Sequence, residues 1–213
     1  MKMDREMDYA ARIALSFFIA TAAFAVVFAV SSYVVHYNLE LTGRGNEYIA
    51  QYVTETGTYL SAFSCDEKLL REASSKLDEV GSNVAFLEAK IGKGDERVME
   101  QKKLYSALEL EHSRIVDNFN AKCGANFTKI FFVYSNTNEK DESEKTGFIL
   151  TAYKNAHPET MIYSFDYDLE SDAISSLKAR YNVTSAPVVI VRGRSFEISG
   201  INDVDSILKD INY

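Results

Sequence analysis

The sequence contains only two cysteines, Cys65 and Cys123, among 213 residues. Two thiols cannot build a disulfide-dense scaffold or a four-thiolate zinc site. Basic residues are in the minority, with 23 Lys and Arg against 31 Asp and Glu and a formal net charge of -8. This acidity argues against a general nucleic-acid binder, so we expect no nucleic-acid partner. Hydrophobic residues make up 46% and charged residues 25%, both near globular averages, which predicts an ordered core.

Several motifs that carry common chemistry are also missing. The chain has no G-x-G-x-x-G and no phosphate-binding P-loop. The three histidines, His36, His112 and His157, are too dispersed to indicate a metal site, and we expect no metal and no cofactor. We expect both His112 and His157 to be surface residues.

One long apolar run is present near the N-terminus. Residues 13–35 are 23 residues without a charge, proline or glycine. As a helix this run would be roughly 35 Å long, enough to cross a hydrocarbon core of ~30 Å. A cleaved signal peptide is the alternative, because Ala29-Val30-Ser31 resembles a cleavage site. The apolar run continues past that site, so an uncleaved signal anchor over 13–37 is favoured, with the lipid bilayer contacted through 13–35.

The charges around this run predict its orientation. Lys2, Arg5 and Arg12 precede it, whereas only Arg44 follows within fifteen residues. Positive flanks stay in the cytoplasm, so 1–12 is predicted to be a cytoplasmic tail and the chain after the run to be extracytoplasmic. The expected location is therefore the cell membrane, with a single pass.

Residues 46–123 lack proline and are predicted to be helical throughout. Ser64-Cys65-Asp66-Glu67 has the form of a capping box and predicts the start of a second helix. Gly92-Lys93-Gly94 predicts a turn, after which Asp95 caps a third helix that Gly124 ends. The expected apolar positions of the second helix are Leu69, Leu70, Ala73, Leu77, Val80, Val84, Leu87 and Ile91. Those of the third helix are Val98, Leu104, Tyr105, Leu108, Ile115, Val116 and Phe119.

Two long helices joined by a short turn are expected to form an antiparallel hairpin, here a stalk over 38–125. The midpoint between Cys65 and Cys123 falls at Gly94, on the turn, so the two sulfurs should meet at the open end and form a disulfide. Two buried, unpaired thiols are the alternative. A redox-active pair is a further alternative, but Asp66 and Glu67 oppose a thiolate at Cys65.

From Phe127 onward strands alternate with helices. The expected order is strand, helix, strand, helix, two strands and a final helix, which predicts a mixed sheet covered by helices. The strands are expected at 129–134, 160–165, 187–191 and 195–198. The helices are expected at about 143–156, 169–181 and 202–211.

The run Tyr181-Asn-Val-Thr-Ser-Ala-Pro-Val-Val-Ile-Val191 resembles the aromatic-x-aliphatic-x-x-x-Pro segment of thioredoxin-like domains. The resemblance covers about residues 127–213 and implies a thioredoxin-like domain over 126–213. It also implies a cis peptide bond before Pro187 and a cis-proline loop at Ser185, Ala186 and Pro187.

The chain departs from the thioredoxin pattern at the family's reactive dithiol. Where that family places Cys-x-x-Cys, this chain has Ser135, Asn136, Thr137 and Asn138, with no thiol within ten residues on either side. Dithiol exchange is excluded there, and a serine nucleophile would need a base, but no histidine is near in sequence. Acidic residues at the start of the next helix oppose an anionic ligand. They are Glu139, Asp141, Glu142 and Glu144. We therefore predict no catalytic residue.

These observations favour a non-enzymatic function. We expect a membrane-anchored protein whose redox-inactive thioredoxin-like domain binds or scaffolds an envelope protein or peptide. The alternatives are a thiol-disulfide oxidoreductase that uses Cys65 and Cys123, and a purely structural tether. Asn126 and Asn182 lie in N-x-[ST] sequons and are candidate glycosylation sites.

Overall fold

The computed structural model describes residues 2–62, 65–137 and 140–211. The chain divides into two compact units, Met1–Asn46 and Glu47–Tyr213. Helix α1 (Lys2–Ala62) crosses the boundary between them. All other elements belong to the second unit.

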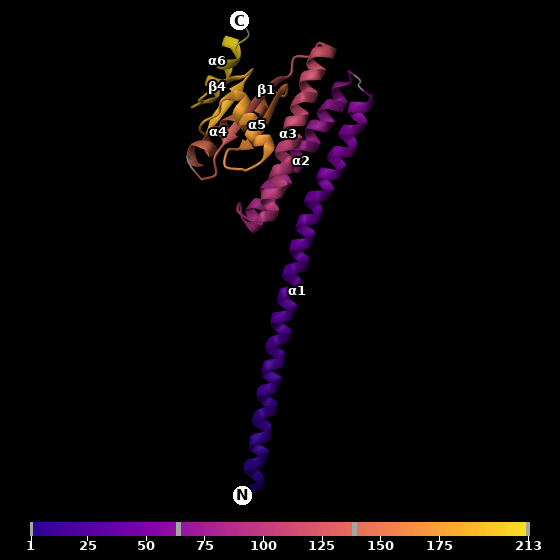
Figure 1. Ribbon diagram of the computed structural model, residues 1–213, viewed down its shortest axis with the longest axis vertical. Coiled ribbons are helices and arrows are strands. Elements are labelled where there is room, and N and C mark those ends of the chain that lie inside the picture. Colours follow the sequence, from indigo (N-terminus) through magenta and orange to yellow (C-terminus); the bar gives the residue numbers. More distant parts are fainter. Residues whose placement is uncertain (1, 63–64, 138–139, 212–213) are drawn as a thin grey trace. The chain divides into compact units, whose positions relative to one another are not determined.

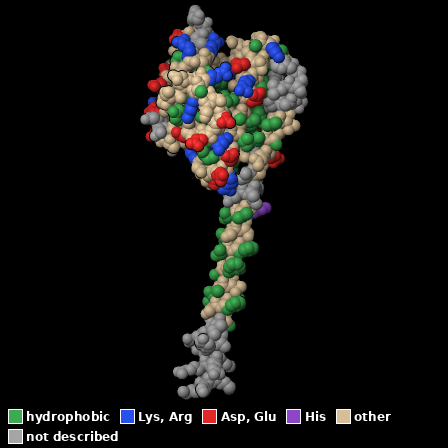
Figure 2. Space-filling view, viewed as in Figure 1, with side chains coloured by type: hydrophobic (Ala, Val, Ile, Leu, Met, Phe, Trp, Pro, Cys, Tyr) green, Lys and Arg blue, Asp and Glu red, His purple; other side chains and the backbone are tan. Residues whose placement is uncertain are grey.

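The first unit contains the apolar run. Within the described residues, Ala14–Tyr37 is the single helical segment that is long and apolar enough to cross a membrane. Every side chain in this segment is exposed, and Figure 2 shows its apolar side chains uncovered. The Thr21 hydroxyl donates to the Phe17 carbonyl at 2.9 Å, so this polar group is satisfied within the helix. Length and composition of this kind fit a membrane anchor or a signal sequence.

Two long helices follow, α2 (Glu67–Ile91) and α3 (Glu96–Cys123), and they pack against each other. Asp95 caps α3 by accepting from the Arg97 backbone N–H at 3.0 Å, and Gly124 ends that helix in the left-handed conformation, so both sequence predictions are confirmed. The cap of α2 is Asp66, which accepts from the Lys68 N–H at 2.9 Å. Ser64, the predicted start of the capping box, lies outside the described residues.

The rest of the second unit is a four-stranded mixed sheet with flanking helices, which confirms the predicted sheet and its cover (Figure 1). The strand order is β2-β1-β3-β4, with β1 and β2 parallel and the other pairs antiparallel. The strands are β1 (Thr128–Tyr134), β2 (Thr160–Asp166), β3 (Val188–Val191) and β4 (Arg194–Phe196). The helices are α4 (Lys140–Ala156), α5 (Asp172–Tyr181) and α6 (Ile201–Ile211).

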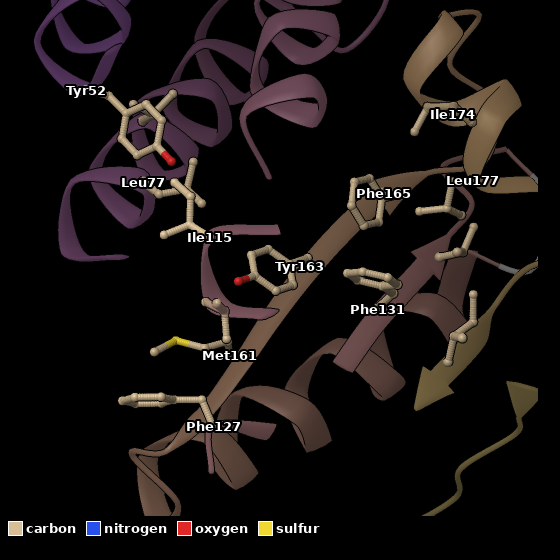
Figure 3. Packing of buried hydrophobic residues seen from close by; sticks show 14 of the residues in the cluster. Tyr52, Leu77, Ile115, Phe127, Phe131, Met161, Tyr163, Phe165, Ile174 and Leu177 are labelled. Carbon is tan, nitrogen blue, oxygen red and sulfur yellow. The ribbon is translucent and has the colours of Figure 1, made fainter. Parts of the chain in front are cut away.

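The alternation of side chains along β1 separates two hydrophobic clusters. Phe131 and Val133 face a cluster that includes residues of α2, α3 and α5 (Figure 3). Ile130 and Phe132 face the opposite cluster, to which α4 and α6 contribute. The sequence analysis assigns 38–125 and 126–213 to separate domains, whereas the structure places residues of α2 and α3 in one core with the sheet.

The apolar face of α2 is largely as predicted, and that of α3 is confirmed in part, because Val98, Ile115, Val116 and Phe119 are buried as expected. Leu70, Leu77 and Val84 of α2 are buried as expected. Leu104 of α3, expected in the core, is 47% exposed, and polar side chains are buried along the same helix instead. These buried polar residues are Gln101, Lys102, Ser106, Glu109, His112 and Ser113.

Candidate functional site

The residues that follow β1 and β2 meet at one edge of the sheet. Because β1 and β2 are parallel, their carboxyl ends lie at the same edge, which is where open α/β sheets commonly hold ligands. Ser135, Asn136 and Thr137 follow β1, and Asp168 follows β2. The structure brings these four residues together. Asn138, the last position of the predicted group, lies outside the described residues.

Asp168 is the centre of this cluster. Its Oδ2 accepts from the Ser135 hydroxyl at 2.7 Å, the Thr137 hydroxyl at 3.0 Å and the Asn136 backbone N–H at 3.1 Å. Burial acts to raise the pKa of Asp168, but the hydrogen bonds from Ser135, Thr137 and Asn136 outweigh it and lower the pKa below its ordinary value. The carboxylate therefore remains ionised and is a weak base.

This geometry does not favour nucleophilic catalysis by Ser135. The side chain is buried, and its hydroxyl donates to a carboxylate whose lowered pKa makes proton abstraction unfavourable. The backbone N–H of Ser135 is also occupied, because it donates to the Ser143 hydroxyl of α4 at 3.0 Å. The cluster thus fixes the loop after β1 onto the start of α4.

A cavity of about 340 Å³ adjoins Ser185, Ala186 and Pro187. Its other walls include Glu142 near the start of α4, Phe196 at the end of β4 and Glu197 directly after that strand. The peptide bond between Ala186 and Pro187 is cis. The cavity carries two carboxylates and no cationic side chain among its lining residues, so its electrostatic potential favours a cationic or neutral occupant over an anion.

Tyr167 connects the two loops at this edge. Its hydroxyl donates to the Thr184 carbonyl at 3.0 Å, one residue before the loop at 185–187. The Lys178 ammonium lies 3.6 Å from the centre of the Tyr167 ring, a close cation–π contact. The loop after β2 is therefore tied to the segment before β3.

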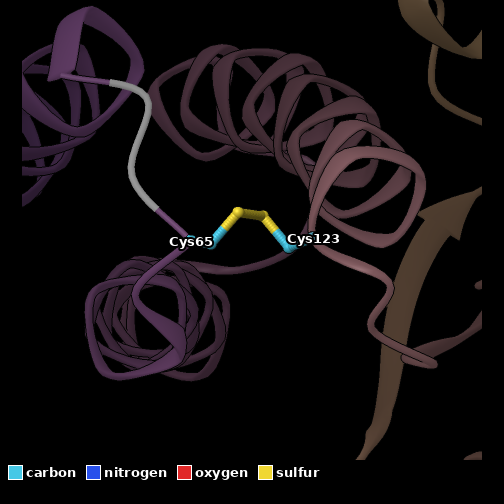
Figure 4. Close-up of a disulfide and its surroundings, with 2 residues drawn as sticks. All are labelled: Cys65 and Cys123. Carbon is cyan, nitrogen blue, oxygen red and sulfur yellow. A yellow bond between two sulfur atoms is a disulfide. The ribbon is translucent and has the colours of Figure 1, made fainter.

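The two cysteines are placed as the sequence predicts. The sulfurs of Cys65 and Cys123 lie at disulfide-bonding distance, and the Cα atoms are 5.5 Å apart (Figure 4). The pair links Cys65, which precedes the N-cap of α2, to the last residue of α3. Asp66 and Glu67 follow Cys65 directly in the sequence, and Cys123 is partly buried against the hydrophobic cluster that contains Phe127.

The remaining predicted positions are exposed. Asn126 lies between α3 and β1, and Asn182 ends α5 in the left-handed conformation. Both asparagine side chains are accessible to a modifying enzyme. Within the part of the chain that the structure describes, no group of three His, Cys, Asp or Glu side chains is arranged to hold a metal ion.

The sequence analysis missed a buried charge cluster next to this edge. Lys102 of α3 is almost fully buried and forms ion pairs with Asp166 and, at 2.8 Å, with Glu88 of α2. Burial acts to lower the pKa of Lys102, but contacts with Tyr134, Asp166 and Glu88 raise it above its ordinary value. Asp166 also accepts from the Asn136 amide at 2.7 Å. The charge cluster therefore supports the loop that carries Ser135 and Thr137.

Glu109 lies along the edge of the sheet. Its Oε1 accepts from the Ser164 backbone N–H at 2.7 Å, so α3 satisfies a donor of the edge strand β2. Burial raises the pKa of Glu109 well above its ordinary value, and the hydrogen bond from Ser164 only partly opposes this. A neutral carboxyl group is therefore favoured at this position.

His112 is buried, so the expectation that it is a surface residue is wrong. Its Nδ1 lies 2.8 Å from the Tyr163 hydroxyl and its Nε2 lies 3.1 Å from the Ser74 hydroxyl. The Ser74 hydroxyl itself donates to the Leu70 carbonyl at 2.9 Å, so Ser74 accepts from the histidine and is not activated by it. Burial, assisted by the charge of Lys154, lowers the pKa of His112 to about 4.

We predict that His112 makes the stability of the protein fall below neutral pH. The unfolded chain gains a proton at His112 near pH 6.5 but the folded chain only near pH 4, so acidification across this window favours unfolding. The expected loss is roughly 3 kcal/mol, at about 1.4 kcal/mol per pH unit. Urea unfolding of the full chain in detergent micelles, at pH 7.5 and pH 4.5, measures it.

The matched variants are His112→Gln, which should lose this part of the pH dependence, and His157→Gln, which should retain it. His157 is partly exposed and serves as the control because it leaves the buried network intact. If the free energy of unfolding falls equally in the wild type and in His112→Gln between pH 7.5 and pH 4.5, His112 is not the source of the pH dependence.

One sequence signal could have found these buried polar residues. Val98, Lys102, Glu109, His112 and Val116 are spaced by three, four or seven residues and so share a face of α3. The two valines at the ends indicate that this face is buried, so the polar residues between them are expected to be buried as well. A search for apolar residues alone passes over them.

Comparison with protein-family models, with curated proteins and with solved structures finds no match for this chain. Similarity therefore assigns neither a family nor an activity. The arrangement at the sheet edge, the exposed apolar segment and the cysteine pair remain as the basis for a function.

Proposed function

We propose that the protein is a single-pass, membrane-anchored extracytoplasmic protein whose redox-inactive thioredoxin-like domain binds an extended segment of an envelope protein or peptide. In this proposal residues 13–37 are an uncleaved signal anchor, α2 and α3 form a helical hairpin, and 126–213 is the thioredoxin-like domain. The observation that carries the proposal is the pairing of an inert cluster around Asp168 with an open cavity beside Ser185–Pro187.

The inert cluster supports binding over catalysis. The place of the thioredoxin dithiol holds hydroxyl and amide groups that are already hydrogen-bonded to Asp168 and Asp166. No group there combines an accessible nucleophile with a base in the described residues. Chemistry at this edge would require these hydrogen bonds to break.

The cavity and the nearby strand edge support an extended partner. β4 is the terminal strand in the described sheet order, and all but Phe196 of its side chains are exposed. An extended peptide can bind such an edge through backbone hydrogen bonds and can place a side chain in the adjacent cavity. Neither interaction needs a cysteine.

The exposed run Ala14–Tyr37 supports the anchor. An apolar segment with all its side chains exposed is unfavourable in water and favourable in a bilayer. The excess of Lys2, Arg5 and Arg12 before the run supports a cytoplasmic N-terminus.

Site-specific photo-crosslinking tests the binding proposal. A photoreactive amino acid at Glu197, which lines the cavity, should give discrete adducts in the membranes of the cells that produce the protein. The same amino acid at Ser176, an exposed position on α5, is the control and should give only background. Ser185→Trp fills the cavity and should abolish the adducts from Glu197, whereas Ser176→Trp should not. Equal adducts from both positions, or adducts that survive Ser185→Trp, would overturn the proposal.

A thiol-disulfide oxidoreductase that uses Cys65 and Cys123 is the second candidate. Cys65 is solvent-exposed, so a small thiol can reach it. The adjacent carboxylates of Asp66 and Glu67 oppose the thiolate that exchange requires. The reduction potential of the cysteine pair separates this candidate from a structural disulfide.

A further inference from the structure

A second, larger cavity lies away from the loop at 185–187. Its volume is about 720 Å³, within the range of small-molecule sites. It is open to solvent on one side and is lined by α2, α3 and α4 and by the strands β1 and β2. Lys102 lies at one part of its wall, so the cavity reaches the buried charge cluster.

Small residues on facing helices leave this space open. Gly81 and Ala85 line it from α2, and Gly147 lines it from α4. A side chain at position 81 would place its Cβ 2.6 Å from the Tyr105 hydroxyl, so glycine is needed for Tyr105 to lie against α2. The Lys154 ammonium of α4 binds the Asp78 carboxylate of α2 at 2.8 Å and joins the two walls.

The charges that line the cavity are unbalanced. Four carboxylates face two ammonium groups, an excess of two negative charges. Both ammonium groups are already engaged, because Lys102 binds Glu88 and Asp166 and Lys154 binds Asp78. The four carboxylates are Asp78, Glu88, Glu144 and Asp166. An anionic ligand would be repelled, whereas a cation would be attracted.

Aromatic side chains supply the apolar part of the lining. Tyr105 and Tyr134 contribute from α3 and β1, Phe132 from β1 and Phe148 from α4. Phe148 is 75% exposed, which is unusual for a phenylalanine that packs in a core. Aromatic faces attract cations through their quadrupoles, and the Lys102 ammonium already lies 5.7 Å from the Tyr134 ring centre.

We propose that this cavity binds a small organic cation, an ammonium or guanidinium group carried on an apolar body. The excess of carboxylates attracts the charged group, and the aromatic walls cover the apolar body. This site is separate from the peptide cavity beside Ser185–Pro187 and does not depend on the function proposed for it. The cation can belong to a free small amine or to a lysine or arginine side chain of a peptide.

Calorimetric titration of the full chain in detergent micelles tests the chemistry of the ligand. One arm compares benzylammonium with its neutral isostere benzyl alcohol. The other arm compares acetyl-Gly-Lys-Gly-amide with the same peptide carrying norleucine in place of lysine. In at least one arm the cation should bind about tenfold more tightly than its neutral partner, and that arm identifies the source.

Matched variants on one helix test the location. Ala85→Leu fills the cavity and should weaken binding of the cation at least tenfold, whereas Ala89→Leu is an exposed substitution one turn away outside the lining and should leave it unchanged. Glu144→Gln removes a carboxylate from the lining and should weaken binding several-fold, whereas Glu72→Gln on α2 should not. All four positions are solvent-exposed or partly so, and circular dichroism checks that each variant is folded.

Each outcome decides the proposal. If neither benzylammonium nor the lysine peptide binds more tightly than its neutral counterpart, the assigned chemistry is wrong. Binding that survives Ala85→Leu, or that Ala89→Leu weakens equally, overturns the assigned location. Selective loss with Ala85→Leu and Glu144→Gln supports both, whatever the crosslinking at Glu197 shows.

Discussion

Replacing Cys65 and Cys123 together by serine should lower the free energy of unfolding by about 4 kcal/mol. The two residues are 58 positions apart, and a crosslink that closes a loop of this length restricts the unfolded chain by about this amount in the chain-entropy account. For a chain of this size the loss corresponds to a fall in Tm of roughly 10 °C. Urea or thermal unfolding of the full chain in detergent micelles measures it.

Chemical reduction provides the control for this prediction. Dithiothreitol should destabilise the wild type by the same amount and should leave the double serine variant unchanged. Thiol alkylation in isolated membranes, followed by a gel shift, should find both cysteines oxidised, as expected outside the cytoplasm. Free thiols there would contradict the proposed orientation. A pair that opens near -200 mV, rather than below roughly -300 mV, would favour the oxidoreductase over a structural disulfide.

The parts of the fold that the sequence predicted are those with a regular pattern. The continuous apolar run of β1 and the 3.6-residue apolar spacing of α2 are local patterns, and both elements are present. The pairing of Cys65 with Cys123 followed from their equal distance from the turn at Gly94. Asp95 and Gly124 marked helix ends because capping is a local interaction.

The parts that could not be predicted depend on contacts between distant segments. Nothing local to α3 indicates that Lys102 meets Asp166, because the two residues are 64 positions apart. The packing of α2 and α3 against the sheet is equally non-local, since an apolar face does not specify what covers it. Leu104 was misplaced because only apolar residues of α3 were assigned to the core, whereas Lys102, Glu109 and His112 fill part of the buried face of this helix.

The candidate site was only partly within reach of the sequence. The resemblance located Ser135 and Pro187 but offered no partner for Ser135. Asp168 lies 33 positions from Ser135 and joins it only because β1 and β2 are parallel neighbours. Strand order therefore had to be known before the carboxylate that binds Ser135 could be found.

Substituting Lys102 by methionine should destabilise the protein by about 3–5 kcal/mol. Methionine keeps the length of the side chain but leaves the carboxylates of Asp166 and Glu88 without their cation, in a region where Asp166 is only 6% exposed. An uncompensated buried charge is the source of such large losses. The matched control is Lys103→Met on the same helix, whose exposed pair with Glu100 should contribute less than about 1 kcal/mol. Urea unfolding compares the two variants, and equal losses would contradict this account.

The charge itself can be separated from the shape of the side chain. Adding Asp166→Asn and Glu88→Gln to Lys102→Met should restore most of the lost stability at neutral pH, since none of the three charges of this cluster then remains. Loss of the Lys102 charge should also loosen the candidate site, because Asp166 accepts hydrogen bonds from the Asn136 side-chain amide and the Asp168 backbone N–H. Hydrogen exchange of the backbone amides of Asn136 and Thr137 should therefore be faster in Lys102→Met but not in Lys103→Met. This result would show that the buried lysine of α3 keeps the loop after β1 ordered.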